Sequence, residues 1–306
     1  MENIKIFFQI LVIFSLAPIL PGIINRVKAK FAGRQGRSIF QLYFDLYKLI
    51  NRGMVYPKVS GIIFKMAAPS VLAFTAASAV IMPFGGQSGL LSFSGDFLLI
   101  AYFLAFSRFL LILSAMDTSS AFEGMGASRE AQFAVFAEPV FFMSMLTLSR
   151  ITGETSVYGI FSKLSPDLWI QNAPVLSLIT GSLFILLLCE SSRVPFDDPD
   201  THLELTMIHE VMILDNSGTD LAFMLYASYL KFWIYASFVS AIILPRHSDF
   251  FFSDSFIYMS GLFFTSVAAG VTESIMARVR LLRVPQFLLA AFSISVMAFV
   301  FQAVKG

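Results

Sequence analysis

The sequence is dominated by apolar stretches that are long enough to cross a lipid bilayer. A helix needs about 20 apolar residues to span the hydrocarbon core, where it satisfies its own backbone hydrogen bonds. Eight such stretches occur, at residues 4–24, 62–82, 97–116, 134–150, 175–191, 221–244, 255–275 and 284–303. Hydrophobic residues make up 57% of the chain and charged residues 13%, against about a quarter charged in ordinary soluble domains. The sequence therefore predicts an all-α integral membrane protein, with residues 1–306 forming a single polytopic domain.

The basic residues gather in every second loop, and this pattern predicts how the chain is oriented in the membrane. Counted together with Lys65 at the start of the second stretch, the odd-numbered loops hold 14 of the 21 Lys and Arg residues, whereas loop 83–96 holds none. These loops are at about 25–60, 117–133, 190–220 and 276–284. Because cytoplasmic loops are enriched in Lys and Arg, we expect them to be cytoplasmic and both termini to lie outside. The first stretch ends at Pro18 and Pro21 without a convincing cleavage site, so we expect a retained anchor rather than a signal peptide.

Residue counts exclude several kinds of site. The chain has one cysteine, Cys189, which excludes an internal disulfide and a cysteine-held Fe–S cluster. Three histidines leave little room for haem or a metal cage. His209 lacks the second histidine, four residues further on, that a zinc-protease helix needs; His202 could share a helix face with it, but we expect no metal site. The net charge of +1 gives no indication of a nucleic-acid partner.

A basic turn and an amphipathic segment follow the first apolar stretch. The turn, residues 33–38, contains Arg34 and Arg37, each preceded by a glycine, and residues 39–50 then place apolar side chains on one helical face and Asp45 and Lys48 on another. We expect an interfacial helix at the cytoplasmic surface, held by lipid headgroups, serving as a docking platform for a soluble partner, or forming the floor of a chamber.

Several charged residues fall at or near bilayer depth. Arg108 lies in the middle of the third stretch, Glu138 lies early in the fourth and Lys231 lies within the sixth. Each such charge costs about 2.5–3.5 kcal/mol on insertion scales, so these three are expected to face the bundle interior and serve an ion pathway. Near stretch ends, Glu273 is expected to snorkel to the interface, and Asp117 either to snorkel or to face inward.

The loop after the fifth stretch is rich in carboxylates. Eight of the 20 Asp and Glu residues lie between positions 190 and 220, accompanied by one basic residue, Arg193. Those that we single out are Glu190, Asp197, Asp200, Glu204 and Glu210. Carboxylates that share a partly dry site raise one another's pKa, so such a cluster could exchange protons near neutral pH.

These motifs together resemble the complex I membrane subunit that forms the quinone chamber (subunit 1, or H). The resemblance rests on Glu190, Arg193, Pro195-Phe196-Asp197, Pro199-Asp200 and Glu204 in the acidic loop. Arg129 and Glu138 reproduce an Arg–Glu spacing of the same family, and the basic turn leading to Asp45 matches its first cytoplasmic loop. The resemblance covers essentially the whole chain.

Within that superfamily, further motifs look more like the membrane subunit of group 4 [NiFe] hydrogenases, including formate hydrogenlyase. They are Ser107-Arg108-Phe109, Met116-Asp117-Thr118, the 126–131 segment and the 273–280 segment. His202 stands where complex I usually has an acid, and the stretch from Glu204 to Gly218 is longer. These departures argue against carrying over a quinone site.

The resemblance implies a non-catalytic subunit that anchors a cytoplasmic redox module in a bacterial or archaeal cytoplasmic (inner) membrane and couples it to proton or sodium translocation. The partners implied are a [NiFe] hydrogenase-like large subunit, an Fe–S small subunit, a ferredoxin-like Fe–S subunit and antiporter-like membrane subunits. The [NiFe] centre and Fe–S clusters would belong to those partners, with no cofactor or catalytic residue in this chain.

Specific roles follow from the same resemblance. The proton-path or coupling residues would be Glu138, Arg129, Glu190, Arg193, Asp197, Asp200, Glu204, Glu210, Asp117 and Lys231, with Arg193 pairing with the acidic cluster. The docking residues would be Arg34, Arg37, Asp45, Lys48, Arg278, Arg280 and Arg283. The alternatives are a true quinone-chamber subunit of NADH:quinone oxidoreductase, the membrane subunit of a related ferredoxin-linked complex, and an independent transporter.

Overall fold

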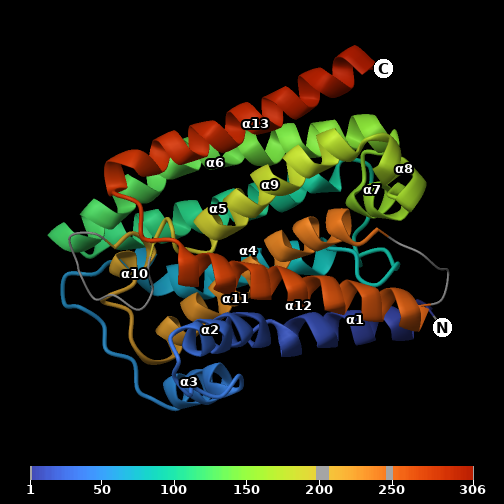
Figure 1. Ribbon diagram of the computed structural model, residues 1–306. Helices are drawn as coiled ribbons and strands as arrows, with labels where there is room; N and C mark the ends of the chain where they lie inside the picture. Colours follow the sequence, from blue (N-terminus) through green and yellow to red (C-terminus); the bar gives the residue numbers. More distant parts are fainter. Residues whose placement is uncertain (1, 198–206, 246–250, 306) are drawn as a thin grey trace.

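The computed structural model describes residues 2–197, 207–245 and 251–305, which form a helical bundle without β-strands (Figure 1). The helices are α1 (Glu2–Leu16), α2 (Ile19–Phe31), α3 (Gln41–Ile50), α4 (Ile62–Ile81), α5 (Asp96–Asp117), α6 (Ala121–Thr152), α7 (Val157–Lys163), α8 (Pro166–Gln171), α9 (Ala173–Glu190), α10 (His209–Met212), α11 (Gly218–Ile243), α12 (Phe251–Ile275) and α13 (Val284–Lys305), with a 3-10 turn, η1 (Leu281–Arg283), before the last.

The predicted membrane-spanning architecture is confirmed. Within the described parts of the chain, eight helical segments are long and apolar enough to cross a bilayer. The first combines α1 and α2, which are separated at Pro18, a residue that lacks the N–H needed to continue the helical hydrogen bonds. The most buried is α11, which packs against α4, α9 and α12. Its fully buried Trp233, Phe232 and Phe238 form the centre of the larger apolar core.

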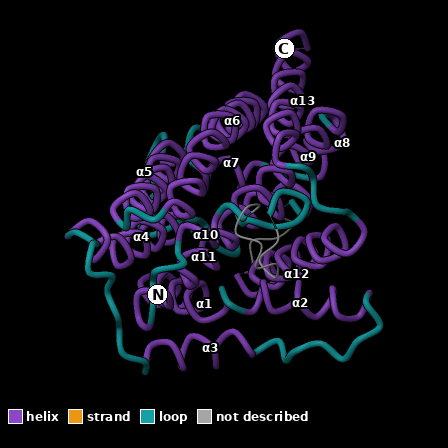
Figure 2. The backbone as a smooth tube through the Cα atoms, turned by 90° about the vertical axis from the view of Figure 1, so that its left-hand side faces the viewer, coloured by secondary structure: helices purple, strands orange, loops and turns teal. Residues whose placement is uncertain are grey.

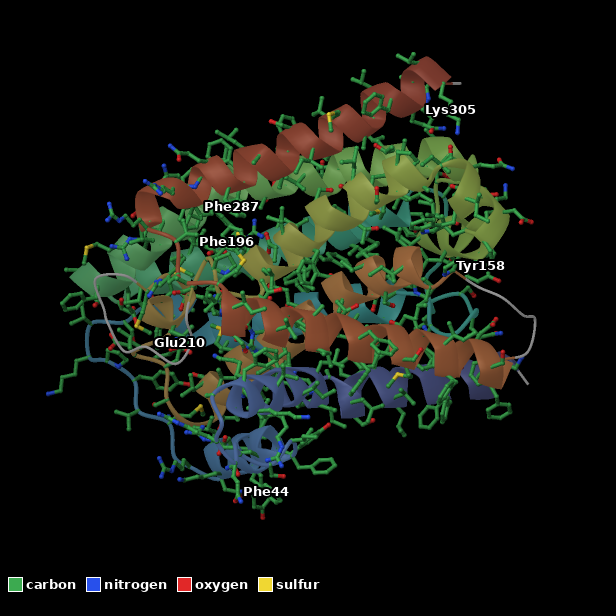
Figure 3. All side chains as sticks on the ribbon, viewed as in Figure 1. Phe44, Tyr158, Phe196, Glu210, Phe287 and Lys305 are labelled. Carbon is green, nitrogen blue, oxygen red and sulfur yellow. The ribbon has the colours of Figure 1, made fainter. Side chains whose placement is uncertain are left out.

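The amphipathic helix predicted after the first span is also confirmed. It is α3, which in Figures 1 and 2 lies across the direction of the long helices, at the edge of the bundle. Leu46 is buried on its inner face, whereas Phe44 and Tyr47 are exposed, and Figure 3 shows Phe44 pointing away from the bundle.

The fourth span is longer than the sequence predicted. Its apolar stretch covers residues 134–150, but α6 is continuous from Ala121 to Thr152. At 1.5 Å per residue, 32 helical residues extend about 48 Å, whereas the hydrocarbon core is about 30 Å thick. Most of the predicted 117–133 loop is therefore a helical extension, in which Arg129 and Glu130 lie.

The two ends of the bundle differ in what they carry. Figure 1 shows both termini, α7 and α8 at one end, and α3, α10 and the α5–α6 and α12–α13 connections at the other, here called the α10 end. An even number of spans places both termini on the same side. That the α10 end is cytoplasmic stays a prediction from the distribution of Lys and Arg.

Candidate functional site

The centre of the site is a group of ion-paired side chains from three different spans. Glu190 is the last residue of α9, and its carboxylate contacts the guanidinium of Arg108 on α5. The other oxygen of the same carboxylate, Oε2, lies 2.7 Å from Nζ of Lys231 on α11. Only 4% of the Glu190 side chain and 5% of the Arg108 side chain are exposed, so water contributes little to their solvation. Each charge is therefore stabilised mainly by the other.

Two carboxylates of α6 complete this group. Glu130 Oε1 lies 3.1 Å from Nε of Arg108, and Glu138 Oε1 lies 3.4 Å from its Nη1. Glu130 is largely buried, whereas 47% of the Glu138 side chain is exposed. We call Arg108, Glu130, Glu138, Glu190 and Lys231 the Arg108 cluster. It contains three carboxylates and two cations, so one carboxylate is in excess when all five groups are charged.

A cavity of about 70 Å³ lies against this cluster, on the side of the α10 end. Its wall includes Arg108, Glu130, Glu190 and Lys231, together with His209 and Glu210 at the start of α10. Figure 3 shows Glu210 at the end of the bundle that carries the α12–α13 connection. The cavity therefore joins the buried charges to the end of the molecule where the basic loops gather.

A second group of buried charges joins α2, the α9–α10 connection and α12. Both oxygens of Glu273 are engaged: Oε2 lies 3.1 Å from Lys28 Nζ, and Oε1 lies 3.5 Å from Arg193 Nη1. The Glu273 side chain is fully buried, so the prediction that it snorkels to the interface is wrong. Snorkelling was expected because Glu273 is near the end of a span, but two cations from other segments meet it inside the protein.

Asp197 links the α12–α13 connection to α10. Its Oδ1 lies 2.8 Å from Arg278 Nη2, and its Oδ2 accepts hydrogen bonds from the backbone N–H groups of Ile208 and His209, at 3.0 and 3.2 Å. Arg278, predicted to dock a partner, is therefore engaged within this chain. Arg193 contacts Glu273, and its predicted role as the cation that balances the acidic loop stays a prediction.

Two other predicted coupling residues, Asp117 and Arg129, hold the local backbone in place. Asp117 accepts hydrogen bonds from the N–H groups of Gly61 and Phe64, at 2.7 and 3.1 Å, and so caps the first turn of α4. Arg129 donates to the carbonyl of Met207, 2.8 Å away, just before α10. Their participation in a proton path stays a prediction, as does that of Glu210. Asp200, Glu204 and His202 lie outside the described residues.

The remaining predicted docking residues lie at the α10 end. Arg34, Arg37, Lys48, Arg280 and Arg283 are exposed, and Asp45 is half-buried and accepts a hydrogen bond from Gln41. No contact with a partner tests their role, which stays a prediction.

Sequence reasoning missed two members of the site. The sequence motif points to Arg129 and not to its neighbour Glu130. Which of the two faces the interior depends on the direction of each side chain on the helix, and a motif does not show that direction. His209 was considered as a metal ligand. Among the described residues, no three His, Cys, Asp or Glu side chains converge as a metal site.

Comparison with known proteins places this arrangement in a family. The sequence matches the NADH dehydrogenase family over residues 4–303. The chain belongs to that family. It is 29% identical to hydrogenase-4 component C of Escherichia coli (strain K12) over 305 residues, which cover 96% of this chain and 93% of the relative. It is 27% identical to formate hydrogenlyase subunit 4 of the same organism, covering 95% and 96%. The predicted resemblance to complex I subunit 1/H, and within it to hydrogenase subunits, is confirmed.

Two further comparisons extend over more distant relatives. A subunit of NADH-quinone oxidoreductase from Caulobacter vibrioides is 23% identical over 222 residues, 67% of this chain and 60% of the relative. A chain of the archaeal membrane-bound sulfane sulfur reductase superimposes with a TM-score of 0.82 at 19% identity, covering 97% of this chain and 99% of that one. The shared fold and the eight apolar segments identify a multi-pass membrane protein.

Proposed function

We propose that this chain is the membrane-anchor and coupling subunit of a [NiFe] hydrogenase or formate hydrogenlyase-type complex in a bacterial or archaeal cytoplasmic membrane. The observation that carries the proposal is the Arg108 cluster, because charged groups within a membrane-spanning bundle are costly and four of these five are largely buried. The two Escherichia coli relatives, which align along nearly their whole length, are components of such complexes by name.

The cluster is suited to load and release a proton. One excess carboxylate can accept a proton and bring the group to charge balance, and a nearby change of charge shifts the affinity for that proton. In the proposed complex that change comes from electron transfer in a module docked at the α10 end. The cavity of about 70 Å³ supplies the route between the cluster and this end of the bundle.

The redox centres are assigned to partner subunits. Fe–S clusters are held by several Cys thiolates, and this chain has one cysteine, Cys189. We therefore assign the [NiFe] centre to a hydrogenase-like large subunit, and the Fe–S clusters to a small subunit and a ferredoxin-like subunit. Antiporter-like membrane subunits would move the coupling ion, H⁺ or Na⁺. The exposed basic residues Arg34, Arg37, Lys48, Arg280 and Arg283 would seat the soluble module.

The coupling role is tested by removing one carboxylate charge in the intact complex. Glu138→Gln is the first variant, because this side chain is half-exposed and its loss should leave the fold in place. We expect unchanged assembly and dye-linked hydrogen oxidation, with a reduced turnover-linked membrane potential in inverted vesicles. Glu154→Gln is the matched control. Glu154 lies in the connection between the fourth span and α7, and its ion pair with Lys163 is on the surface. If Glu138→Gln and Glu190→Gln both keep full coupling, the assignment is wrong.

Composition of the complex is tested by a mild-detergent pull-down of the tagged chain, with mass spectrometry and nickel analysis. Stoichiometric nickel with a hydrogenase-like large subunit is expected. Recovery of NADH dehydrogenase subunits without nickel would replace the proposal with the quinone-chamber function. A chain that elutes alone would contradict both.

A further inference from the structure

His209 is a titratable group in the wall of the cavity that the proposed function leaves unused. It is the first residue of α10 and lines the cavity together with Arg108, Glu130, Glu190 and Lys231. The neighbouring residue Glu210 also lines the cavity, toward the outer end of the bundle (Figure 3). His209 therefore lies between the buried cluster and the α10 end.

The position of His209 is held from two sides. From one side, the Asp197 carboxylate accepts its backbone N–H at 3.2 Å while Arg278 holds that carboxylate at 2.8 Å. A second link between the same two segments is the hydrogen bond from the Val279 N–H to the Pro195 carbonyl, 3.0 Å long.

From the other side, α6 packs closely against α10 at Gly126. A Cβ built at this glycine would lie 2.9 Å from the carbonyl oxygen of Ile208 and 2.9 Å from Cγ of Met212, so only a glycine allows the approach. Arg129, one turn further along α6, donates to the Met207 carbonyl. Two rigid elements thus fix the backbone that carries the imidazole, as a group that acts on a defined neighbour requires.

Burial keeps His209 neutral. Burial lowers the pKa of His209 to about 4, and the cations Lys231 on α11 and Arg108 on α5 act in the same direction. The carboxylates Glu130 on α6 and Glu190 on α9 oppose this effect without overcoming it. At pH 7 the ring is therefore a neutral imidazole, with one nitrogen that donates a hydrogen bond and one that accepts.

We propose that His209 relays protons between the outer mouth of the cavity and the carboxylates of the Arg108 cluster, and that Asp197, held by Arg278, positions it. The inference rests on the function proposed above and adds the group that connects the cluster to the α10 end. In the relay, the unprotonated ring nitrogen accepts a proton from water or from Glu210 at the mouth. The other ring nitrogen releases its proton to a carboxylate of the cluster, which leaves the ring neutral but in the other tautomer, and a flip of the ring restores the starting arrangement. One N–H bond forms and one breaks, with no electron transferred.

The test uses His209→Ala in the intact complex, assayed with and without added imidazole. Membrane potential in inverted vesicles is measured during hydrogen turnover, because imidazole as a permeant base dissipates a pH gradient but not an electrical one. We expect His209→Ala to lower the rate of potential formation by about 10-fold or more. General acid–base groups typically contribute roughly 10²–10⁴-fold, but other steps also limit turnover here and reduce the effect that is measured. Millimolar imidazole should restore most of this rate, since it fits the space left by the side chain.

Controls separate the relay from a structural role and from the proposed function itself. Imidazole should not restore Glu138→Gln, which lacks a carboxylate rather than a ring. Asp197→Asn, which weakens the contact with Arg278, should give a smaller loss than His209→Ala. If His209→Ala fails to assemble, His209→Gln keeps a polar side chain of similar length and should show the same loss.

The outcomes are distinct. Loss of potential that imidazole does not restore would make His209 structural and overturn the relay. Full potential in His209→Ala or His209→Gln, with loss in Glu138→Gln, would overturn the relay and leave the proposed function standing. Full potential in all of these variants and in Glu190→Gln would overturn both.

Discussion

The contact between Lys231 and Glu190 can be tested by a double-mutant cycle. The two single variants differ in which charged contacts remain, so their costs in stability are expected to differ. In Glu190→Gln, Lys231 loses the carboxylate that lies 2.7 Å from its Nζ, and Arg108 loses one of three carboxylates. Removing one partner of a buried ion pair costs about 3–5 kcal/mol. In Lys231→Met, Glu190 keeps its contact with Arg108. The loss of stability should therefore be closer to that of one charged hydrogen bond, about 1.5–3 kcal/mol.

The double variant should cost less than the sum of the two single variants. With Lys231 gone, a neutral Gln at position 190 no longer leaves an unbalanced ammonium group inside the bundle. Contacting residues typically show coupling energies of about 0.5–3 kcal/mol, and we expect this pair to fall between about 1 and 3 kcal/mol. That range corresponds to about 5–150-fold in the population of a locally open state.

Cys189 provides the reporter for this measurement. It is the only cysteine in the sequence, precedes Glu190 on α9 and lines a cavity beside Arg108. Maleimide labelling in native membranes, quantified by mass spectrometry on the peptide that contains Cys189, gives the opening free energy when closing is faster than labelling. Glu154→Gln on the surface should leave the labelling rate unchanged. Single-variant costs that add to the double-variant cost within about 0.5 kcal/mol would refute the assigned pairing.

Two further predictions concern the charges that hold the spans together. Asp117→Ala removes the acceptor for two N–H groups at the start of α4 and should cost about 0.5–2 kcal/mol, seen as faster amide hydrogen exchange around Gly61. Asp117→Asn should retain most of the protection, and equal exchange in wild type and Asp117→Ala would contradict the capping role. Glu273→Gln removes a fully buried carboxylate that contacts Lys28 and Arg193, and should lower the thermal stability of the solubilised complex by an amount equivalent to about 3–5 kcal/mol. A shift no larger than that of the surface variant Glu154→Gln would show that the pair is solvated.

The number of spans and the position of α3 could be predicted from the sequence because both depend on local composition. A bilayer offers no water to hydrogen-bond the backbone, so every apolar stretch of sufficient length must form a helix. The alternation of apolar and charged residues over 39–50 similarly predicts a helix with one wet face, wherever the rest of the chain lies. Arg108, Glu138 and Lys231 stood out for the same reason, since each interrupts an apolar stretch.

The limits of the α6 helix show where local composition ceases to be informative. The apolar stretch ends near residue 134, but the helix continues to Ala121. Hydrophobicity marks the part of a helix inside the bilayer, whereas this extension is stabilised by contacts that no local pattern shows. Gly126 packs against α10, and Glu123, fully buried, accepts the backbone N–H of Asp215 at 3.0 Å.

Only the tertiary structure decided which acid meets which base. Glu190 and Arg108 are 82 positions apart, and the partners of Glu273 come from α2 and from the segment after α9. The energy of an ion pair depends on a distance of a few ångströms and on the exclusion of water, and both are set by how helices rotate and pack against one another. The sequence therefore determined that charges are buried in this membrane protein, and the packing of the helices determined that five of them form one group beside His209.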